Sequence, residues 1–222
     1  MNFSKDLETE LRLNSNRELA ITMEKYMKNN FSFLGIQTEK RRAILKNNWH
    51  KHNLEVQNNF RSICYKLFQK KEREFHHCAI DLLLKEIKKK YVLKDIEIIE
   101  KMLVTNSWWD SVDTLAKYIL GGYLQKFPGE IGSVIEQFSN SDNMWLNRSA
   151  ILFQLSYKEK TNFDLLKSEC EKHKDSKEFF IQKAIGWALR DYSRFNPLGV
   201  TIFVEETNLK PLSQREALRN IK

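Results

Sequence analysis

Glycine and proline are scarce in this chain of 222 residues, which contains seven glycines and three prolines. Together they account for about one residue in twenty, against about one in eight in average proteins. β-Sandwiches, β-barrels and disordered linkers all depend on many turn residues, so this composition argues against each of these classes. It favours long helices with short connections.

Cysteine is rare as well, and long apolar runs are missing. Cys64, Cys78 and Cys170 are widely spaced and form no CxxC motif, which argues against structural disulfides and cysteine-based zinc sites. No stretch approaches about 18 uninterrupted apolar residues, and the first residues, MNFSKDLETELRL, lack the apolar run of a signal peptide. We therefore expect a soluble, cytoplasmic protein without a membrane partner.

Motifs of several enzyme classes are absent too. There is no glycine-rich phosphate loop, no Walker pattern and no GxSxG. His76 and His77 with Glu72 resemble half of a helical metal site, but no other cluster of cysteine and histidine completes it. We therefore expect no metal and no cofactor.

What the chain does contain is a repeat. Apolar residues follow a helical period, and a basic, a small and an aliphatic residue recur together along the chain. The small residue falls at positions 43, 79, 114, 150, 184 and 217, spaced by 33 to 36 residues. This period predicts an all-α solenoid of stacked antiparallel helix pairs of the HEAT, armadillo or TPR kind. We expect one domain over residues 1–222, with about six repeats in a superhelix.

Basic residues occupy a regular place in this repeat. The small residue would let the second helix of each pair approach its neighbours, and these helices would line a concave face. A basic residue stands one or two positions before the small one in five repeats, at Arg42, His77, Arg148, Lys183 and Arg215. Lysine and arginine exceed aspartate and glutamate, 37 to 29. The pattern predicts a basic groove for a polyanion such as duplex DNA, and solvated helix faces are the alternative.

Asp113 takes the basic position in the remaining repeat. A carboxylate repels phosphates, so the presence of Asp113 in a predicted phosphate-binding groove needs another explanation. Trp109 lies one helical turn before it, and Phe180, Lys183 and Trp187 form a stripe two repeats later. Two indoles and one carboxylate would suit a cation, with no second carboxylate near Asp113 in the repeat pattern. Alternatively, Asp113 is a structural partner of Arg148.

Neighbouring residues have simpler interpretations. Trp108 and Trp145 are expected in the core. Ser107 and Asp110 form a capping pattern that opens the helix of Asp113, and Ser176 or Asp175 would open the helix that carries Trp187.

Three segments resemble the AlkD family of bacterial DNA alkylation-repair glycosylases: SWWDSVD (107–113), WLNRSAILFQL (145–155) and SKEFFIQKAIGWALRDY (176–192). The likeness extends to residues 25–42 and 211–221, so it covers nearly the whole chain. It implies a HEAT-like repeat fold that holds duplex DNA. It also implies excision of cationic alkylpurines, such as 7-methylguanine and 3-methyladenine, without base flipping. The protein would then be a nucleoid-associated monomer acting in base excision repair.

The resemblance also implies roles for individual residues. Asp113 matches the catalytic carboxylate, and Trp109 and Trp187 match the aromatic residues that contact the deoxyribose of the lesion. Arg148 and Arg190 match basic residues of the groove. Tyr26 matches a tyrosine on the minor-groove side, in an N-terminal helix that residues 14–30 are expected to form.

Two other functions remain open. The first is a non-catalytic paralogue that binds distorted or branched DNA through the same groove, as relatives without the short N-terminal helix do. The second is a HEAT-type scaffold for protein interactions, which would explain the repeats but not the carboxylate among them.

Overall fold

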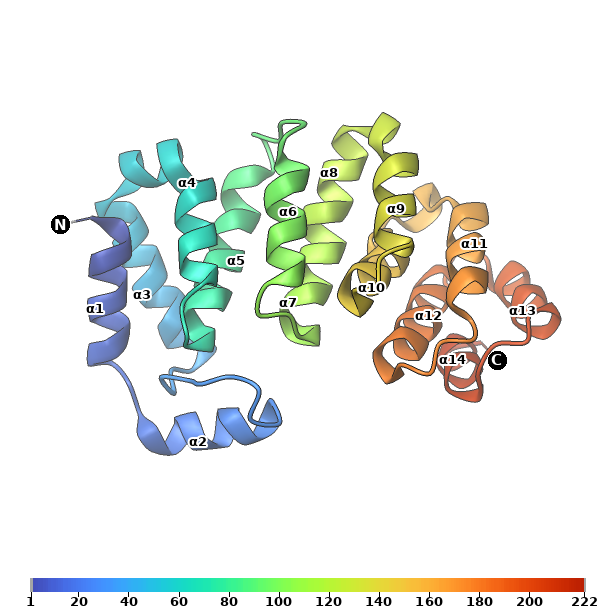
Figure 1. Cartoon of the computed structure of the whole chain (residues 1–222), viewed down its shortest axis with the longest axis horizontal. Coiled ribbons are helices and arrows are strands. Elements are labelled where there is room, and N and C mark those ends of the chain that lie inside the picture. The colour runs from blue at the N-terminus through green and yellow to red at the C-terminus, as the bar shows by residue number, and fades with distance from the viewer. Residues whose placement is uncertain (1, 222) are drawn as a thin grey trace. The chain divides into compact units, whose positions relative to one another are not determined.

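A computed structural model describes residues 2–221. Within this range helices are the only regular elements, apart from an isolated bridge between Ser32 and Glu72, which confirms the prediction of an all-α fold (Figure 1). The packing divides the chain into two compact units, residues 1–92 and 93–222. Each unit is a set of packed helices, and each is described by itself.

The N-terminal unit runs from blue to green in Figure 1. Helix α1 packs on α3, and α4 packs on α5. Phe3, Leu7, Phe60 and Phe75 are fully or almost fully buried between these helices. Its elements are α1 (Phe3–Leu13), α2 (Arg17–Tyr26), α3 (Thr38–Lys51), α4 (Asn53–Phe68) and α5 (Arg73–Ile87).

Helix α2 is the helix expected within residues 14–30. Asn16 starts it, because its side chain accepts hydrogen bonds from the backbone of Glu18 and Leu19. The helix buries only Ala20, so it has almost no core of its own. Its C-terminal residue, Tyr26, is 70% exposed.

The loop after α2 is attached to α5 through Glu74. The buried carboxylate accepts hydrogen bonds from the backbone nitrogens of Leu34, Gly35 and Ile36 at 2.8 to 3.1 Å. Gly35 has a φ of 82°, and a Cβ there would lie 1.9 Å from the carbonyl oxygen of Asn16. Only glycine satisfies both the backbone conformation and the space.

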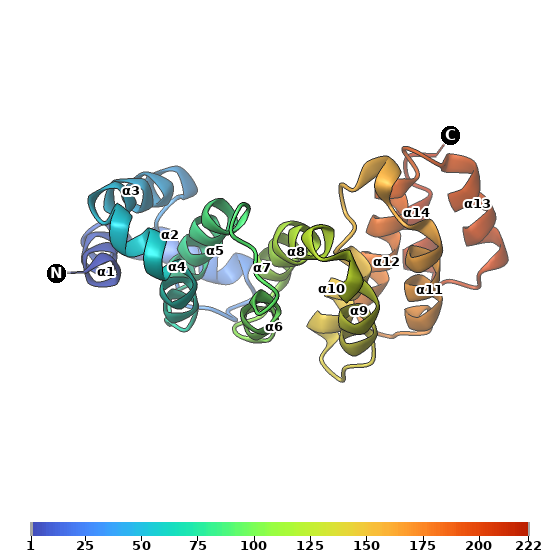
Figure 2. The same cartoon turned by 90° about the horizontal axis from the view of Figure 1, so that it is seen from above.

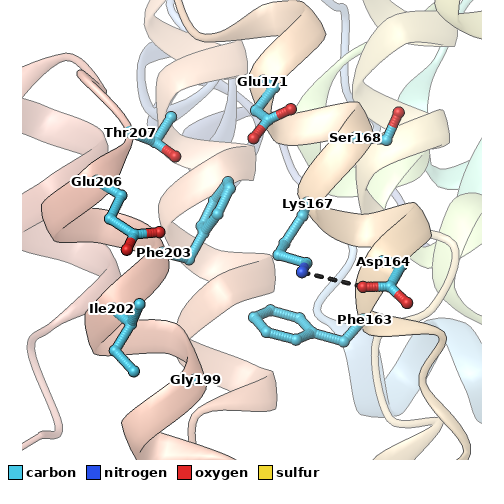
Figure 3. Close-up of a pocket in the computed structure, with 10 residues that line it drawn as sticks. All are labelled: Phe163, Asp164, Lys167, Ser168, Glu171, Gly199, Ile202, Phe203, Glu206 and Thr207. Carbon is cyan, nitrogen blue, oxygen red and sulfur yellow. Dashed lines mark ion pairs between the residues drawn. The ribbon is translucent and has the colours of Figure 1, made fainter.

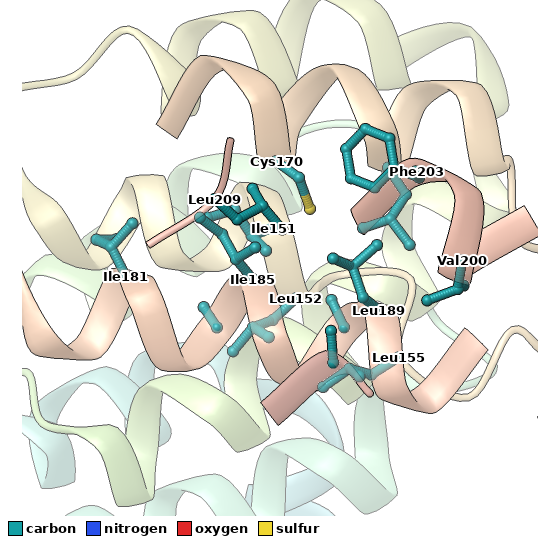
Figure 4. Close-up of a cluster of buried hydrophobic side chains, with 14 of the residues drawn as sticks. Ile151, Leu152, Leu155, Cys170, Ile181, Ile185, Leu189, Val200, Phe203 and Leu209 are labelled. Atoms are coloured by element: carbon teal, nitrogen blue, oxygen red, sulfur yellow. The ribbon is translucent and has the colours of Figure 1, made fainter. Parts of the chain in front are cut away.

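The C-terminal unit continues the pattern of helix pairs, as Figure 2 shows from above. Its core contains Ile151, Leu152, Ile185 and Leu189 together with the buried Cys170 (Figure 4). Its elements are α6 (Asp95–Val104), α7 (Trp109–Thr114), α8 (Gly121–Lys126), α9 (Ile131–Ser139), α10 (Met144–Leu152), α11 (Phe163–His173), α12 (Phe179–Tyr192), α13 (Pro197–Glu206) and α14 (Pro211–Ala217).

The six small residues of the repeat fall on six different helices, with at least one other helix between each and the next: α3, α5, α7, α10, α12 and α14. Those on α5, α10, α12 and α14 are buried alanines, Thr114 is half-buried, and Ala43 is exposed. In the C-terminal unit α10 packs on α12, and α12 packs on α14. The 35-residue period therefore identifies helices that stack on one another in the C-terminal unit.

The helix of Asp113 has an unusual continuation at its C-terminal end and no side-chain cap at its start. Helices α7 and α8 are continuous through a π-helical segment, Leu115–Leu120, and such segments are frequent at functional sites. The predicted cap at Ser107 is wrong, because its hydroxyl donates to the carbonyl of Leu103 in the preceding helix at 2.6 Å. The helix begins at Trp109 without a side-chain cap.

Candidate functional site

A cavity of about 300 Å³ in the C-terminal unit brings most of the predicted site residues together. Its lining comes from the second helices of the pairs, α7, α10, α12 and α14. Six of its nine lining residues were predicted from the sequence. The nine are Trp109, Asp113, Arg148, Phe179, Phe180, Lys183, Trp187, Arg190 and Glu216.

Asp113 is held by Arg148 from the next pair. The guanidinium donates from Nε to Oδ1 at 2.7 Å and from Nη2 to Oδ2 at 2.9 Å. Its Nη1 donates to the carbonyl oxygen of Phe180. The side chains of Arg148 and Asp113 are 5% and 16% exposed. The expected alternative, a structural pair of Asp113 and Arg148, is thus present in the site.

Burial is the main influence on the charge of Asp113. It raises the pKa of the carboxyl above its usual range, and Asp110 adds to this by repulsion. The hydrogen bonds and charge of Arg148 act in the opposite direction and favour the carboxylate. The site therefore holds a partly desolvated carboxylate whose ionisation depends on one arginine.

Both predicted indoles line the same cavity as Asp113. Trp109 is one helical turn before Asp113 on α7, and Trp187 is one turn after Lys183 on α12. Neither ring is fully buried. The cavity thus combines a carboxylate with aromatic surfaces that face a shared space, an arrangement suited to a cation.

A second aromatic layer supports this wall. Phe180 lies 5.2 Å from Trp108 and 5.1 Å from Trp145, and the two indoles lie 5.8 Å apart, measured between ring centroids. The tilted and edge-to-face geometries are those that aromatic rings prefer. Trp108 and Trp145 are therefore packing residues, though half-buried rather than fully buried.

Glu216 is a charged lining residue of this cavity that was not predicted from the sequence. It accepts a hydrogen bond from Lys183 Nζ at 2.8 Å and another from Arg190 Nη1. The expectation of a single carboxylate is therefore wrong. A signal was available, because Glu216 precedes the small residue Ala217 just as Asp113 precedes Thr114.

The two cations decide the state of Glu216. Hydrogen bonds from Lys183 and then Arg190 lower the pKa of its carboxyl to about 2. Glu216 is thus ionised at neutral pH and cannot donate a proton there. The second carboxylate does not provide a general acid.

Gly186 explains how Glu216 reaches α12. A Cβ at Gly186 would lie 2.4 Å from Glu216 Cβ and 2.9 Å from the carbonyl oxygen of Ser213. Helices α12 and α14 therefore approach each other more closely than any side chain at position 186 would permit.

The remaining predicted residues lie outside this cavity. Arg215 is exposed on α14. In the N-terminal unit, Tyr26 is exposed at the end of α2, and Arg42 on α3 donates to Asp81 at 3.2 and 3.4 Å. Arg42 and Asp81 line a separate cavity of about 420 Å³ with Trp49.

Another cavity, of about 540 Å³, lies between α11 and α13 (Figure 3). Phe163 and Phe203 form part of its wall, and Lys167 and Asp164 form an ion pair of 2.9 Å beside them. Its lining, among the residues described, includes none of the predicted site residues.

Over residues 2–221, no group of three or more histidine, cysteine, aspartate or glutamate side chains is arranged to hold a metal ion. His76 instead bonds to Arg73 and to the carbonyl oxygen of Lys70. No helix in the same range is both long enough and apolar enough to cross a membrane.

Comparison with known proteins agrees with this fold. A solved structure from Enterococcus faecalis, named "Predicted DNA alkylation repair enzyme", has a TM-score of 0.85 and 36% identity, covering 93% of this chain and 96% of that one. The structure of smu.31 from Streptococcus mutans UA159 has a TM-score of 0.60 and 15% identity over 92% and 98% of the two chains, which shows a shared fold alone.

No curated protein matches the sequence. The profile of the family described as "DNA alkylation repair enzyme" matches residues 7–221, nearly the whole chain. The fold, the identity to the Enterococcus protein and this match agree with the resemblance of the individual segments. The chain belongs to the family of DNA alkylation repair enzymes.

Proposed function

We propose that this protein is a DNA glycosylase that hydrolyses the N-glycosidic bond of cationic alkylpurines in duplex DNA. Its substrates would include 7-methylguanine and 3-methyladenine, and the reaction would begin base excision repair. The observation that carries the proposal is a desolvated carboxylate, Asp113, that lines one cavity with two indoles, Trp109 and Trp187.

The proposed chemistry needs one carboxylate and no acid. An alkylated ring nitrogen makes the purine cationic, so the bond from C1′ to the base breaks with its electron pair going to the base, which leaves neutral. Asp113 stabilises the positive charge that develops on the sugar and orients the water that attacks C1′. The proton that the water loses passes to the carboxylate or to solvent. A two-carboxylate glycosidase, in contrast, must protonate its leaving group.

The tryptophans would present aromatic faces to the same developing charge. Because Asp113, Trp109 and Trp187 would all act on the sugar rather than on the base, the base need not leave the stack.

DNA contacts would come from cations at the edge of the cavity and from exposed residues elsewhere. Lys183 and Arg190 are 36% and 20% exposed, so a phosphate can reach them. Arg42, Arg215 and Tyr26 are exposed and complete the proposed set. Arg148 is only 5% exposed, so we propose that its main role is to hold Asp113 and not to contact DNA.

One observation favours a second candidate, a non-catalytic protein that binds distorted or branched DNA. Both oxygens of Asp113 are bonded to Arg148, as they would be in a purely structural ion pair. In that case the carboxylate would join α7 to α10 and take no part in chemistry.

Base release from duplexes that contain one 7-methylguanine decides between the candidates. For wild-type protein in excess of DNA we expect release, and for Asp113→Asn a loss of several orders of magnitude. The variant should bind DNA at least as well, because a negative charge has been removed. No release by either protein above the spontaneous rate would support the non-catalytic candidate. Equal rates above the spontaneous rate would mean that Asp113 is not the catalytic carboxylate.

The same assay tests the leaving-group argument. Cationic 3-methyladenine and a cationic adduct with a bulkier alkyl group should also be released. Neutral hypoxanthine, uracil and ethenoadenine should stay, because they need a proton that no group of the site supplies. Efficient release of a neutral base would instead require an acid and a base-flipping pocket.

A further inference from the structure

Glu216 has no part in the proposed release of the base, yet it lies in the cavity with Asp113. Its two oxygens are bonded to the ammonium of Lys183 and the guanidinium of Arg190. Lys183 and Arg190 lie on either side of Trp187 on one face of α12. A carboxylate between these two cations occupies the position that a phosphodiester of DNA would otherwise take.

We propose that Glu216 is a specificity-determining residue that competes with DNA phosphates for Lys183 and Arg190 and thereby weakens binding to undamaged duplex. This inference rests on the proposed function of the site. A repair enzyme meets a vast excess of undamaged DNA, so weaker binding there leaves more enzyme free to find a lesion.

The charge of Glu216 acts differently on the two kinds of DNA. Every duplex presents phosphates, and these are repelled by the carboxylate. Only a duplex with an alkylated purine also presents a positive charge, and that charge is attracted by both Asp113 and Glu216, which line the same cavity. Glu216 therefore repels the phosphates of every duplex, but it attracts only a duplex that contains a cationic base.

The close approach of α12 and α14 at Gly186 supports this role. Without it Glu216 would not reach Lys183 and Arg190. The low pKa of Glu216 means that the competition persists at every physiological pH.

The test is binding of lesion-free duplex by Glu216→Gln, measured as a function of salt concentration. Without the carboxylate, about one more protein cation is available to pair with a phosphate. The slope of log K against log salt should therefore become steeper by about one. At about 0.1 M salt the affinity should rise by up to about tenfold. The ratio of affinities for duplexes with and without 7-methylguanine should fall.

Two control variants separate charge from shape. Glu216→Asp keeps the charge on a shorter side chain, so its affinity should stay within about twofold of wild type. Asp164→Asn removes a carboxylate from an ion pair with Lys167 on α11 (Figure 3), away from the cavity of Asp113. Its salt slope should remain that of wild type.

Weaker binding by Glu216→Gln would overturn the proposal, because Glu216 would then hold the two cations in place for DNA. An unchanged slope, or the same increase in Asp164→Asn, would overturn it as well. Thermal unfolding checks the fold of each variant. If the Gln variant fails to fold, Glu216→Met gives the same test with an apolar side chain against Gly186. Binding to lesion-free DNA does not depend on base release, so this result is independent of the glycosylase assay.

Discussion

At the scale of single residues, Arg148 sets the pH range in which Asp113 is charged. Burial and Asp110 both raise the pKa of Asp113, and only Arg148 is identified as lowering it. A carboxylate that must be ionised loses activity as the pH falls through its pKa. Base release by the wild type should therefore decline at a higher pH than an ordinary aspartate, with a pKa near 3.8, would give.

Replacing Arg148 should raise further the pH at which base release declines. In Arg148→Ala both remaining influences raise the pKa of Asp113, so the acid limb of the pH profile of single-turnover base release should shift upward. Removing one member of a buried ion pair also costs about 3 to 5 kcal/mol of stability. Arg148→Lys retains the charge and should shift the limb less. An acid limb in the same place for Arg148→Ala and wild type would show that Arg148 does not control Asp113.

At the scale of elements, Gly186 determines the distance between α12 and α14. In Gly186→Ala the new methyl group meets Glu216 Cβ and a backbone oxygen of Ser213. We expect a loss of about 1 to 3 kcal/mol in the free energy of unfolding, despite the better helix propensity of alanine.

Gly132 on α9 is the matched control. A Cβ there meets nothing within 4 Å, so Gly132→Ala should be neutral or stabilising by up to about 1 kcal/mol. Urea unfolding of both variants measures the difference. Equal stability changes for Gly186→Ala and Gly132→Ala would mean that α14 adjusts its position freely.

The elements themselves were largely predictable from the sequence. Packing of helix on helix imposes its period on the chain, so Ala150, Ala184 and Ala217 identified α10, α12 and α14. Helix starts were less predictable, because a short polar side chain has several backbone partners within reach. Ser107 bonds backwards to Leu103 instead of opening α7.

The candidate site was also predictable from the sequence only in part. Spacing along one helix places Trp109 with Asp113 and Lys183 with Trp187, and all four line the cavity. The partnership of Glu216 with Lys183 joins residues 33 positions apart on different helices. This contact depends on the close approach of α12 and α14 at Gly186. The spacing of residues along one helix does not reveal such an approach.

At the scale of the whole molecule, the chain has an excess of eight positive charges, but many of the basic residues are paired with carboxylates. Four of the five lysines and arginines predicted to bind DNA are bonded to a carboxylate of another helix: Arg42 to Asp81, Arg148 to Asp113, and both Lys183 and Arg190 to Glu216. The charge available to phosphates is therefore smaller than the number of basic residues suggests.

This pairing predicts the salt dependence of DNA binding. Five unpaired cations would give a slope of log K against log salt of about −4.5, and subtracting the three carboxylates leaves about two net charges and a slope of about −2. Titration of lesion-free duplex between about 0.05 and 0.2 M salt measures it. A slope near −4.5 or steeper would mean that phosphates displace the carboxylates on binding.

The attachment of α2 bears on the order in which the chain folds. Helix α2 buries only Ala20, and the loop that follows it is bonded to Glu74, 38 to 40 residues further along. Such long-range contacts close a large loop and form late. Because α2 is synthesised before α5, we expect its position to become fixed only after α5 has been synthesised. The exposed end of α2, which carries Tyr26, should therefore reach its final position only after Glu74 on α5, about fifty residues later in the chain, has been translated.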